Sequence, residues 1–234
     1  MKVGIIQSNY IPWRGYFDFI DDVDLFIFHD DLQYTKGDWR NRNRVKTPAG
    51  LQWLTVPVRY THREQLIDQV ELDDSQPWRR KHLNLLEANY RSARYFHEYF
   101  RSFEEVLSPA YGNISQLNIA LIRWVMSRLD IKTPTLISRE LNAVGSKTVR
   151  LIDALKKVNG TIYLSGPAAA EYLDLQSFSD HGIRLEYKSY DYPDYTQLWG
   201  DFVPAVSVLD LLFNAGPDAR KYIKSLRPNP IILP

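Results

Sequence analysis

Two short apolar runs, Val3-Gly4-Ile5-Ile6 and Leu25-Phe26-Ile27-Phe28, decide the fold of this chain. Each run predicts a buried strand, and each is followed by a turn dense in polar, charged and aromatic residues. The first turn is Gln7-Ser8-Asn9-Tyr10-Ile11-Pro12-Trp13-Arg14-Gly15-Tyr16, and the second extends from His29 to Arg44. Because a rigid sheet holds the polar groups at its strand ends in one geometry, we expect the functional site within residues 1–60.

Strands alternate with helical stretches along most of the chain, which is typical of α/β proteins. The expected strands are Val3–Gln7, Asp24–His29, Gln52–Arg59, Ile67–Leu72, Thr135–Ser138, Thr161–Leu164 and Ile183–Tyr187. A strand that is apolar on both faces, as Leu25–Phe28 is, indicates a covered parallel sheet. We predict an α/β fold with a mainly parallel, Rossmann-like sheet, flanking helices and a helical section near residues 77–130. Residues 1–234 are predicted to form a single domain.

Apolar residues three and four positions apart predict the helices. In the helical section they predict a helix pair over residues 78–107, broken near Ser92 and Ala93, and a helix over Asn113–Leu129. Further helical segments are expected over Tyr16–Asp21, Ser146–Val158, Ala168–Leu173 and Val206–Phe213, and a short basic segment over Ala219–Ser225. Trp39–Lys46 is predicted to be irregular or helical.

The composition excludes several classes of protein. The net charge of +1 gives no support to a dedicated nucleic-acid binder, and the absence of cysteine excludes a thiol nucleophile, disulfides and thiolate metal ligands. A chain without cysteine fits a reducing cytosol, so we expect a cytoplasmic protein. No apolar stretch is long enough for a transmembrane helix, and the first strand is too short for a signal peptide.

No metal or cofactor motif is present. No two of the five histidines stand four residues apart, the chain has no Walker A sequence, and Gly15 does not belong to a G-x-G-x-x-G motif. We therefore predict no metal and no cofactor. The helix starts after Ser165-Gly166-Pro167 and after Gly145-Ser146-Lys147-Thr148 could each bind an anion, or could simply be capped. The first turn shares only a fold-level analogy with nucleotidylyl transferases, because it lacks their imidazoles.

Charged residues in the second turn are the chemical candidates. Asp30 and Asp31, like Asp18, could act as general bases or orient another group, or could cap a turn or a helix. Arg40, Arg42 and Arg44 could bind a diphosphate, or could form surface ion pairs with the neighbouring aspartates. Among the five histidines, His82 on the helix after Trp78 is the first candidate for a proton carrier.

Motifs along almost the whole chain resemble one known family. They are Gln7…Tyr10-x-Pro12-Trp13-x-Gly15-Tyr16-Phe17-Asp18, Asp30-Asp31-x-Gln33-Tyr34, Trp39-Arg40-Asn41-Arg42-Asn43, Gly50…Trp53-Leu54-x-Val56-Pro57, Trp78-x-x-Lys81-His82 with Tyr90, Tyr163-Leu164-Ser165-Gly166, Tyr172-Leu173, Tyr195-x-Gln197 and Ser207-Val208-Leu209-Asp210-Leu211-Leu212-Phe213-Asn214. The sequence resembles the WbqC-like family of bacterial surface-polysaccharide loci. One departure is Asn9, where Pro or another small residue is expected.

The resemblance implies a role in the synthesis of O-antigen lipopolysaccharide or another surface polysaccharide. It implies a transferase that moves a small acyl or aminoacyl group, such as glycyl, to an amino sugar, which we expect to be nucleotide-linked. Without a cysteine, the acyl group must come directly from a donor such as a thioester, for example on an acyl carrier, an adenylate or an aminoacyl-tRNA. The alternatives are a non-catalytic sugar- or nucleotide-binding module, and a nucleotidyl-type transferase or hydrolase that depends on a divalent cation.

The leading hypothesis assigns each candidate residue a role. Asp31 or His82, with Asp30 beside them, would take the proton from the attacking amine. The substrate-binding candidates comprise phosphate ligands, aromatic pocket walls and polar orienting groups: Lys36, Arg40 and Arg42; Tyr10, Trp13, Tyr34 and Trp39; and Gln33 and Asn41. Polar residues at other strand or helix ends complete the set: Gln7, Ser165, Gly166 and Asp210.

Overall fold

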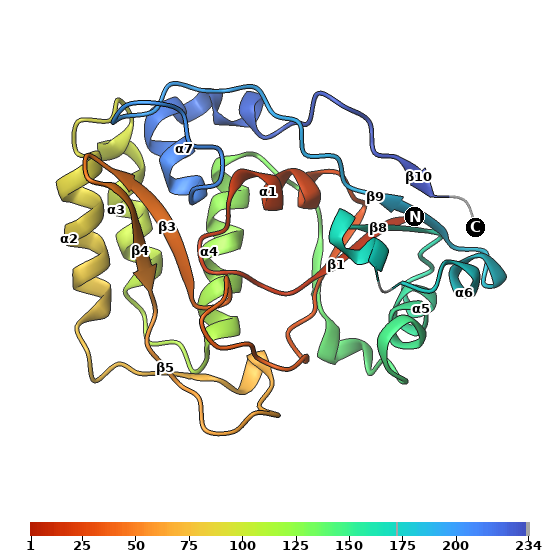
Figure 1. Ribbon diagram of the computed structural model, residues 1–234. Coiled ribbons are helices and arrows are strands. Elements are labelled where there is room, and N and C mark those ends of the chain that lie inside the picture. Colours follow the sequence, from red (N-terminus) through yellow and green to blue (C-terminus); the bar gives the residue numbers. More distant parts are fainter. Residues whose placement is uncertain (172, 233–234) are drawn as a thin grey trace.

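A six-stranded sheet forms the centre of the protein (Figure 1). The structure is a computed structural model that describes residues 1–171 and 173–232. In spatial order the strands are β10 (Ile231–Ile232), β9 (Arg184–Tyr187), β8 (Ile162–Ser165), β1 (Lys2–Ile6), β2 (Leu25–Phe28) and β7 (Thr135–Ile137). Only β10 is antiparallel to its neighbour. The predicted α/β fold with a mainly parallel sheet and flanking helices is confirmed.

The strand order reverses between β1 and β8. From β1 the chain moves outward to β2 and β7, and it then returns to β8 on the other side of β1. At such a switch point the loops at the carboxyl ends of the two strands diverge and leave a crevice, where open α/β sheets bind ligands. The loop after β1 and the end of β8 therefore border the most suitable place for a ligand in this fold.

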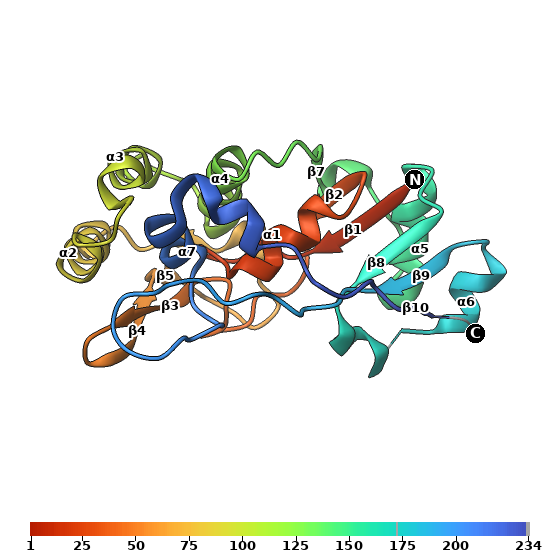
Figure 2. The same cartoon turned by 90° about the horizontal axis from the view of Figure 1, so that it is seen from above.

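Helices cover both faces of the sheet (Figure 2). They are α1 (Arg14–Asp21), α2 (Trp78–Tyr90), α3 (Phe96–Leu107), α4 (Ile114–Arg128), α5 (Lys147–Lys157), α6 (Leu175–Asp180) and α7 (Val208–Ala215). One apolar core joins α1, α2, α3, α4 and α7 to one face of the sheet, and a second core joins α5 and α6 to the other. The helical section predicted near residues 77–130 is α2 to α4.

Alternation along β2 divides its side chains between the two cores. Phe26 and Phe28 pack into the core on the α1 and α4 side, whereas Leu25 and Ile27 pack into the core on the α5 side. This follows from the period of two residues in a strand. Gly4 lets α1 approach β1 closely, since a methyl group there would lie 2.4 Å from Cε1 of Phe19.

The second turn contains a strand that the sequence did not predict. Instead of an irregular or helical Trp39–Lys46 segment, β3 (Arg42–Thr47) pairs antiparallel with β4 (Gly50–Thr55). Asn43 and Val45 point into the protein, while Arg42 and Arg44 are only partly buried on the other face. Arginines on the outward face hid the strand alternation, because they gave the segment the composition of a polar loop.

Other boundaries also differ from the predictions. The expected strand Gln52–Arg59 is broken between β4 and β5 (Val58–Arg59), and Ile67–Leu72 is a 3-10 turn followed by β6 (Glu71–Leu72). In place of the Ala168–Leu173 helix there is a 3-10 turn over Pro167–Glu171, and the basic segment Ala219–Ser225 begins within another such turn, Gly216–Tyr222. Tyr172, which belongs to a family motif, lies outside the described residues. The single domain over residues 1–234 stays a prediction.

Candidate functional site

A pocket of about 350 Å³ lies at the switch point of the sheet. We call it the switch-point pocket. Its walls come from the ends of β1, β2 and β8 and from the start of α5: Ile5, Gln7, His29, Leu32, Lys147, Thr148, Arg150, Leu151, Tyr163 and Leu173. Its position agrees with the general rule for ligand sites in open α/β sheets.

The start of α5 makes one side of this pocket suitable for an anion. Lys147 and Thr148 open the helix, and the N-cap residue Ser146 makes no side-chain hydrogen bond to the first turn. The backbone N–H groups of that turn are therefore free of side-chain capping, and the helix dipole adds a partial positive charge. Lys147 holds an uncommon left-handed backbone conformation, with φ of 50°. Of the two predicted anion sites, this one lies in a pocket.

One lining residue of the pocket, His29, lies close to an aspartate. His29 and Asp31 follow β2, and Nε2 of His29 lies 3.8 Å from Oδ1 of Asp31, longer than a hydrogen bond. The Asp31 carboxylate accepts hydrogen bonds from the hydroxyl of Ser138 and from the guanidinium of Arg150, with which it forms an ion pair. Asp31 is thus held in place by α5 and by the end of β7.

Burial keeps the imidazole of His29 neutral. Desolvation, with a smaller effect of the positive charge of Arg150, outweighs the opposing Asp31 carboxylate and lowers the pKa of His29 to about 4 from its usual 6.5. A neutral imidazole can accept a proton, and Asp31 would stabilise the resulting cation. Since Asp31 already binds Arg150 and Ser138, it is better placed to orient and stabilise His29 than to act as the base itself.

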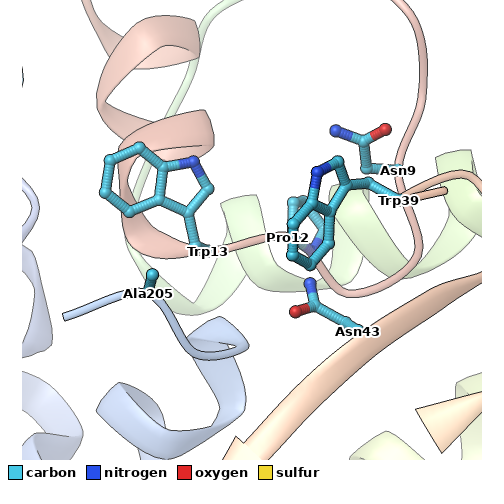
Figure 3. A pocket seen from close by; sticks show the side chains of 6 residues that line it. All are labelled: Asn9, Pro12, Trp13, Trp39, Asn43 and Ala205. Carbon is cyan, nitrogen blue, oxygen red and sulfur yellow. The ribbon is translucent and has the colours of Figure 1, made fainter. Parts of the chain in front are cut away.

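A second cavity, of about 240 Å³, lies on the other side of the β1–α1 loop. We call it the aromatic pocket; it is lined by Asn9, Pro12, Trp13, Trp39, Asn43 and Ala205. The indoles of Trp13 and Trp39 stand on opposite sides of the cavity (Figure 3). Trp13 is held from behind by Tyr190 and Tyr192, whose rings lie 5.2 and 5.8 Å from it.

Gly15 fixes the position of Trp13. A methyl group at Gly15 would lie 2.3 Å from Cζ2 of the indole, so Gly15→Ala should displace Trp13 and destabilise the protein by about 1–3 kcal/mol. Thermal unfolding followed by circular dichroism measures the loss. The control is Gly166→Ala, because a methyl group there meets no atom within 4 Å. An unchanged melting temperature for Gly15→Ala would contradict the packing argument.

His82 and Tyr10 lie in the core rather than in a pocket. The Nδ1 atom of His82 lies 2.9 Å from the Tyr10 hydroxyl, and its Nε2 lies 3.1 Å from the Thr55 carbonyl oxygen. Tyr10 is fully buried, and burial lowers the pKa of His82 to about 4. With both ring nitrogens bonded to protein, His82 is a weaker candidate for proton transfer than His29.

Asp30 and Asp210 are each enclosed by a separate hydrogen-bond network. Asp30 accepts from the Ser8 backbone N–H at 2.7 Å and from the Ser115 hydroxyl at 2.5 Å, which ties the β1–α1 loop to α4. Asp210 accepts from two tyrosine hydroxyls, those of Tyr90 and Tyr195, each at 2.8 Å. Burial raises the pKa of both carboxyls. These contacts position loops and helices, and neither carboxylate lines either of the two pockets.

The remaining predicted residues divide between the pockets, the core and the surface. Gln7 lines the switch-point pocket, Ser165 is the last residue of the strand β8, and Gly166 follows it. Trp13 and Trp39 line the aromatic pocket, and Arg42 precedes the lining residue Asn43 on β3. Five others line neither pocket: Asn41 bonds to the Val56 carbonyl, Tyr34 packs on Tyr60, Arg40 pairs with Asp38, Gln33 donates to the Arg63 carbonyl, and Lys36 is exposed.

Sequence reasoning did not assign a role to His29, Arg150 or Asn9, and it considered Lys147 only as part of a helix start that could bind an anion. The pattern Leu25, Ile27, His29, Asp31 contained a signal for His29, because alternate residues after a strand continue along the same face. Arg150 gave no such signal, since its contact with Asp31 joins residues far apart in the chain. Within residues 1–171 and 173–232, no group of three or more His, Cys, Asp or Glu is placed to hold a metal. No helix in these ranges is long and apolar enough to cross a membrane.

The sheet topology defines a Rossmann-like α/β protein with a pocket at its switch point. The chain belongs to the WbqC-like protein family, whose model matches residues 7–222. It is 46% identical over 232 residues to an uncharacterized protein of Mycobacterium tuberculosis, Rv1507c, with 97% of this chain and 99% of that protein covered. No solved structure matches the chain significantly.

Proposed function

We propose that the protein transfers a small acyl or aminoacyl group to the amine of a nucleotide-linked amino sugar in the synthesis of a bacterial surface polysaccharide. The observation that carries the proposal is the switch-point pocket, which combines an open helix start, two cations and a neutral histidine beside a carboxylate. Family membership supports the polysaccharide context.

The cationic side of the pocket suits the diphosphate of a nucleotide sugar. Lys147 supplies a positive charge that no carboxylate of the described residues pairs with, and the first turn of α5 supplies backbone N–H donors, whereas Arg150 is held by Asp31. In this proposal Arg40, Arg42 and Lys36 do not bind the diphosphate, since none of them lines this pocket. Gln7 is available to orient a polar group of the sugar.

His29 takes the proton in the transfer step. The amine nitrogen forms a bond to the acyl carbon, and the bond from that carbon to the oxygen or sulfur of the donor breaks. The leaving group departs with the electron pair, and the proton of the amine passes to the His29 imidazole. Asp31, fixed by Arg150 and Ser138, stabilises the resulting imidazolium.

The assay is mass spectrometry of a UDP-linked amino sugar incubated with the purified protein and an activated donor. We expect the mass of one acyl or aminoacyl group to be added without a divalent cation. Binding of the nucleotide sugar without turnover by any donor class would contradict transfer and indicate a binding module. Loss of phosphate or of nucleotide that requires a divalent cation would indicate a hydrolase or a nucleotidyl-type transferase instead.

Lys147→Ala should weaken the binding of UDP about tenfold or more, since it removes a charged donor to phosphate worth about 1.5 kcal/mol. Isothermal titration calorimetry measures the dissociation constant. The matched control is Lys156→Ala, which removes the same charge from an exposed position at the other end of α5. Equal affinities of the two variants for UDP would show that the diphosphate does not bind at the start of α5.

A further inference from the structure

The aromatic pocket is shaped for one flat ring. Its volume of about 240 Å³ is below the roughly 300–1,000 Å³ of pockets that enclose a whole drug-sized ligand. Trp13 and Trp39 flank it on opposite sides and their rings are not parallel (Figure 3), so a planar group there can stack on the Trp39 ring and meet the edge of Trp13. Its other walls include Pro12 and Ala205. A sugar ring fits this pocket poorly, because most of its hydroxyl groups would be buried without partners.

Asn9 is the polar group available to a ligand in this pocket. Its side-chain amide makes no hydrogen bond within residues 1–171 and 173–232, and its Oδ1 is shielded from solvent. The other amide, that of Asn43, is already used: it donates to the carbonyl oxygens of Tyr10 and Ile11 and accepts from the Arg44 N–H. With its Oδ1 enclosed, Asn9 offers a ligand the N–H donors of its amide, and N7 of adenine can accept such a bond.

Two arginines extend from the pocket along the outer face of the β3–β4 hairpin. With two partly exposed indoles they form what we call the arginine–indole platform: Trp39, Arg42, Arg44 and Trp53. The Arg42 guanidinium lies 4.3 Å from the Trp53 ring, and that of Arg44 lies 5.6 Å from the Trp39 ring. Within the described residues neither arginine has a carboxylate partner. Their charge is therefore available for a phosphate.

We propose that the aromatic pocket and the arginine–indole platform bind the adenosine 5′-phosphate unit of the acyl donor. The adenine lies between Trp13 and Trp39 and bonds to Asn9, and its phosphate binds Arg44, the arginine nearest Trp39. The inference rests on the proposed function, because three of the donor types that suit a chain without cysteine share this unit. Acyl-adenylates, coenzyme A thioesters and aminoacyl-tRNA all contain adenosine with a 5′-phosphate.

The position of this subsite fits a donor that reaches the switch-point pocket. Gln7 lines the switch-point pocket and Asn9 lines the aromatic pocket. Because a residue spans at most about 3.6 Å along the chain, the Cα atoms of these two residues are within about 7 Å of each other. The two pockets therefore share the β1–α1 loop as a wall, and a donor bound on one side needs only a short reach to the amine on the other.

The test is calorimetric titration of AMP into the wild-type protein and its variants. We expect AMP to bind more tightly than UMP, and Trp39→Ala, Arg44→Ala and Asn9→Ala each to weaken AMP binding about tenfold. The controls are Trp199→Ala, an indole that is 38% exposed elsewhere, and Arg101→Ala on α3. Both should bind AMP as the wild type does. Melting temperatures establish that each variant is folded.

Three results would overturn the proposal: no binding of AMP, equal binding of AMP and UMP, or AMP affinity that survives both Trp39→Ala and Arg44→Ala. The source of the unit is distinguished by titrating coenzyme A and the RNA trinucleotide CCA beside AMP. If coenzyme A or CCA binds more tightly than AMP, and replacement of Arg42 or Trp53 removes that gain, the tighter ligand identifies the carrier. If both bind with the affinity of AMP, the unit belongs to a free adenylate. If the protein does not bind AMP as proposed, the binding of UDP at Lys147 is unaffected. The two proposals can therefore fail independently of each other.

Discussion

Replacement of His29 by Gln should lower the rate of acyl transfer by about 10²–10⁴-fold and leave the affinity for UDP nearly unchanged. The imidazole accepts the amine proton in the proposed mechanism, and an amide cannot take that role. It also lies beside Asp31, which would stabilise the charge that develops on it. The diphosphate instead binds Lys147 and the first turn of α5, which this change leaves in place.

His82→Gln is the matched control for this experiment. It removes the other buried histidine, whose ring nitrogens are engaged by Tyr10 and Thr55 and which lines neither pocket. We expect its transfer rate, per mole of folded protein, to stay within a few-fold of the wild-type value. The rates come from mass spectrometry of the acylated nucleotide sugar. A rate that falls with His82→Gln but not with His29→Gln would reverse the assignment.

The central fold could be predicted from the sequence because its signals are local. Leu25–Phe28 is apolar at every position, so it must be covered on both faces, and that alone indicates a parallel sheet between helices. β3 lacked this signal. Its partly exposed positions carry Arg42 and Arg44, whose guanidinium groups lie over the Trp53 ring of the neighbouring strand. The contact that makes this segment a strand comes from β4, not from its own composition.

The sequence was enough to place the candidate site at the strand ends. It was not enough to show which residues at those ends lie together in one pocket. Asp30 and Asp31 are adjacent, yet Asp30 bonds to Ser115 on α4 and Asp31 bonds to Arg150 on α5. Consecutive residues at the end of a strand point to opposite faces, so only Asp31 shares the side of His29 and the switch-point pocket. Aromatic residues of one motif divide similarly: Tyr10 enters the core, whereas Trp13 lines a pocket.

Acidification should destabilise the protein mainly through its two buried histidines. Burial lowers the pKa values of His29 and His82 to about 4 from 6.5. Between these pH values the unfolded chain binds protons that the folded protein does not. The contribution of the two histidines to the free energy of unfolding is therefore fully present above pH 6.5 and is lost as the pH falls towards 4. Each histidine contributes up to about 1.4 kcal/mol per pH unit, or about 3 kcal/mol over the range.

His82→Gln should reduce this pH dependence by about half, even where the variant is less stable overall. The free energy of unfolding in urea, measured at a series of pH values between 7 and 5 (about the upper part of the titration range), gives the slope for each protein. Asp30 and Asp210, whose pKa values burial raises, oppose the acid effect, but both remain in the variant. His97→Gln, at an exposed position, should keep the wild-type slope. If the His82→Gln slope also equals that of the wild type, the imidazole enclosed by Tyr10 and Thr55 is not kept neutral by its burial.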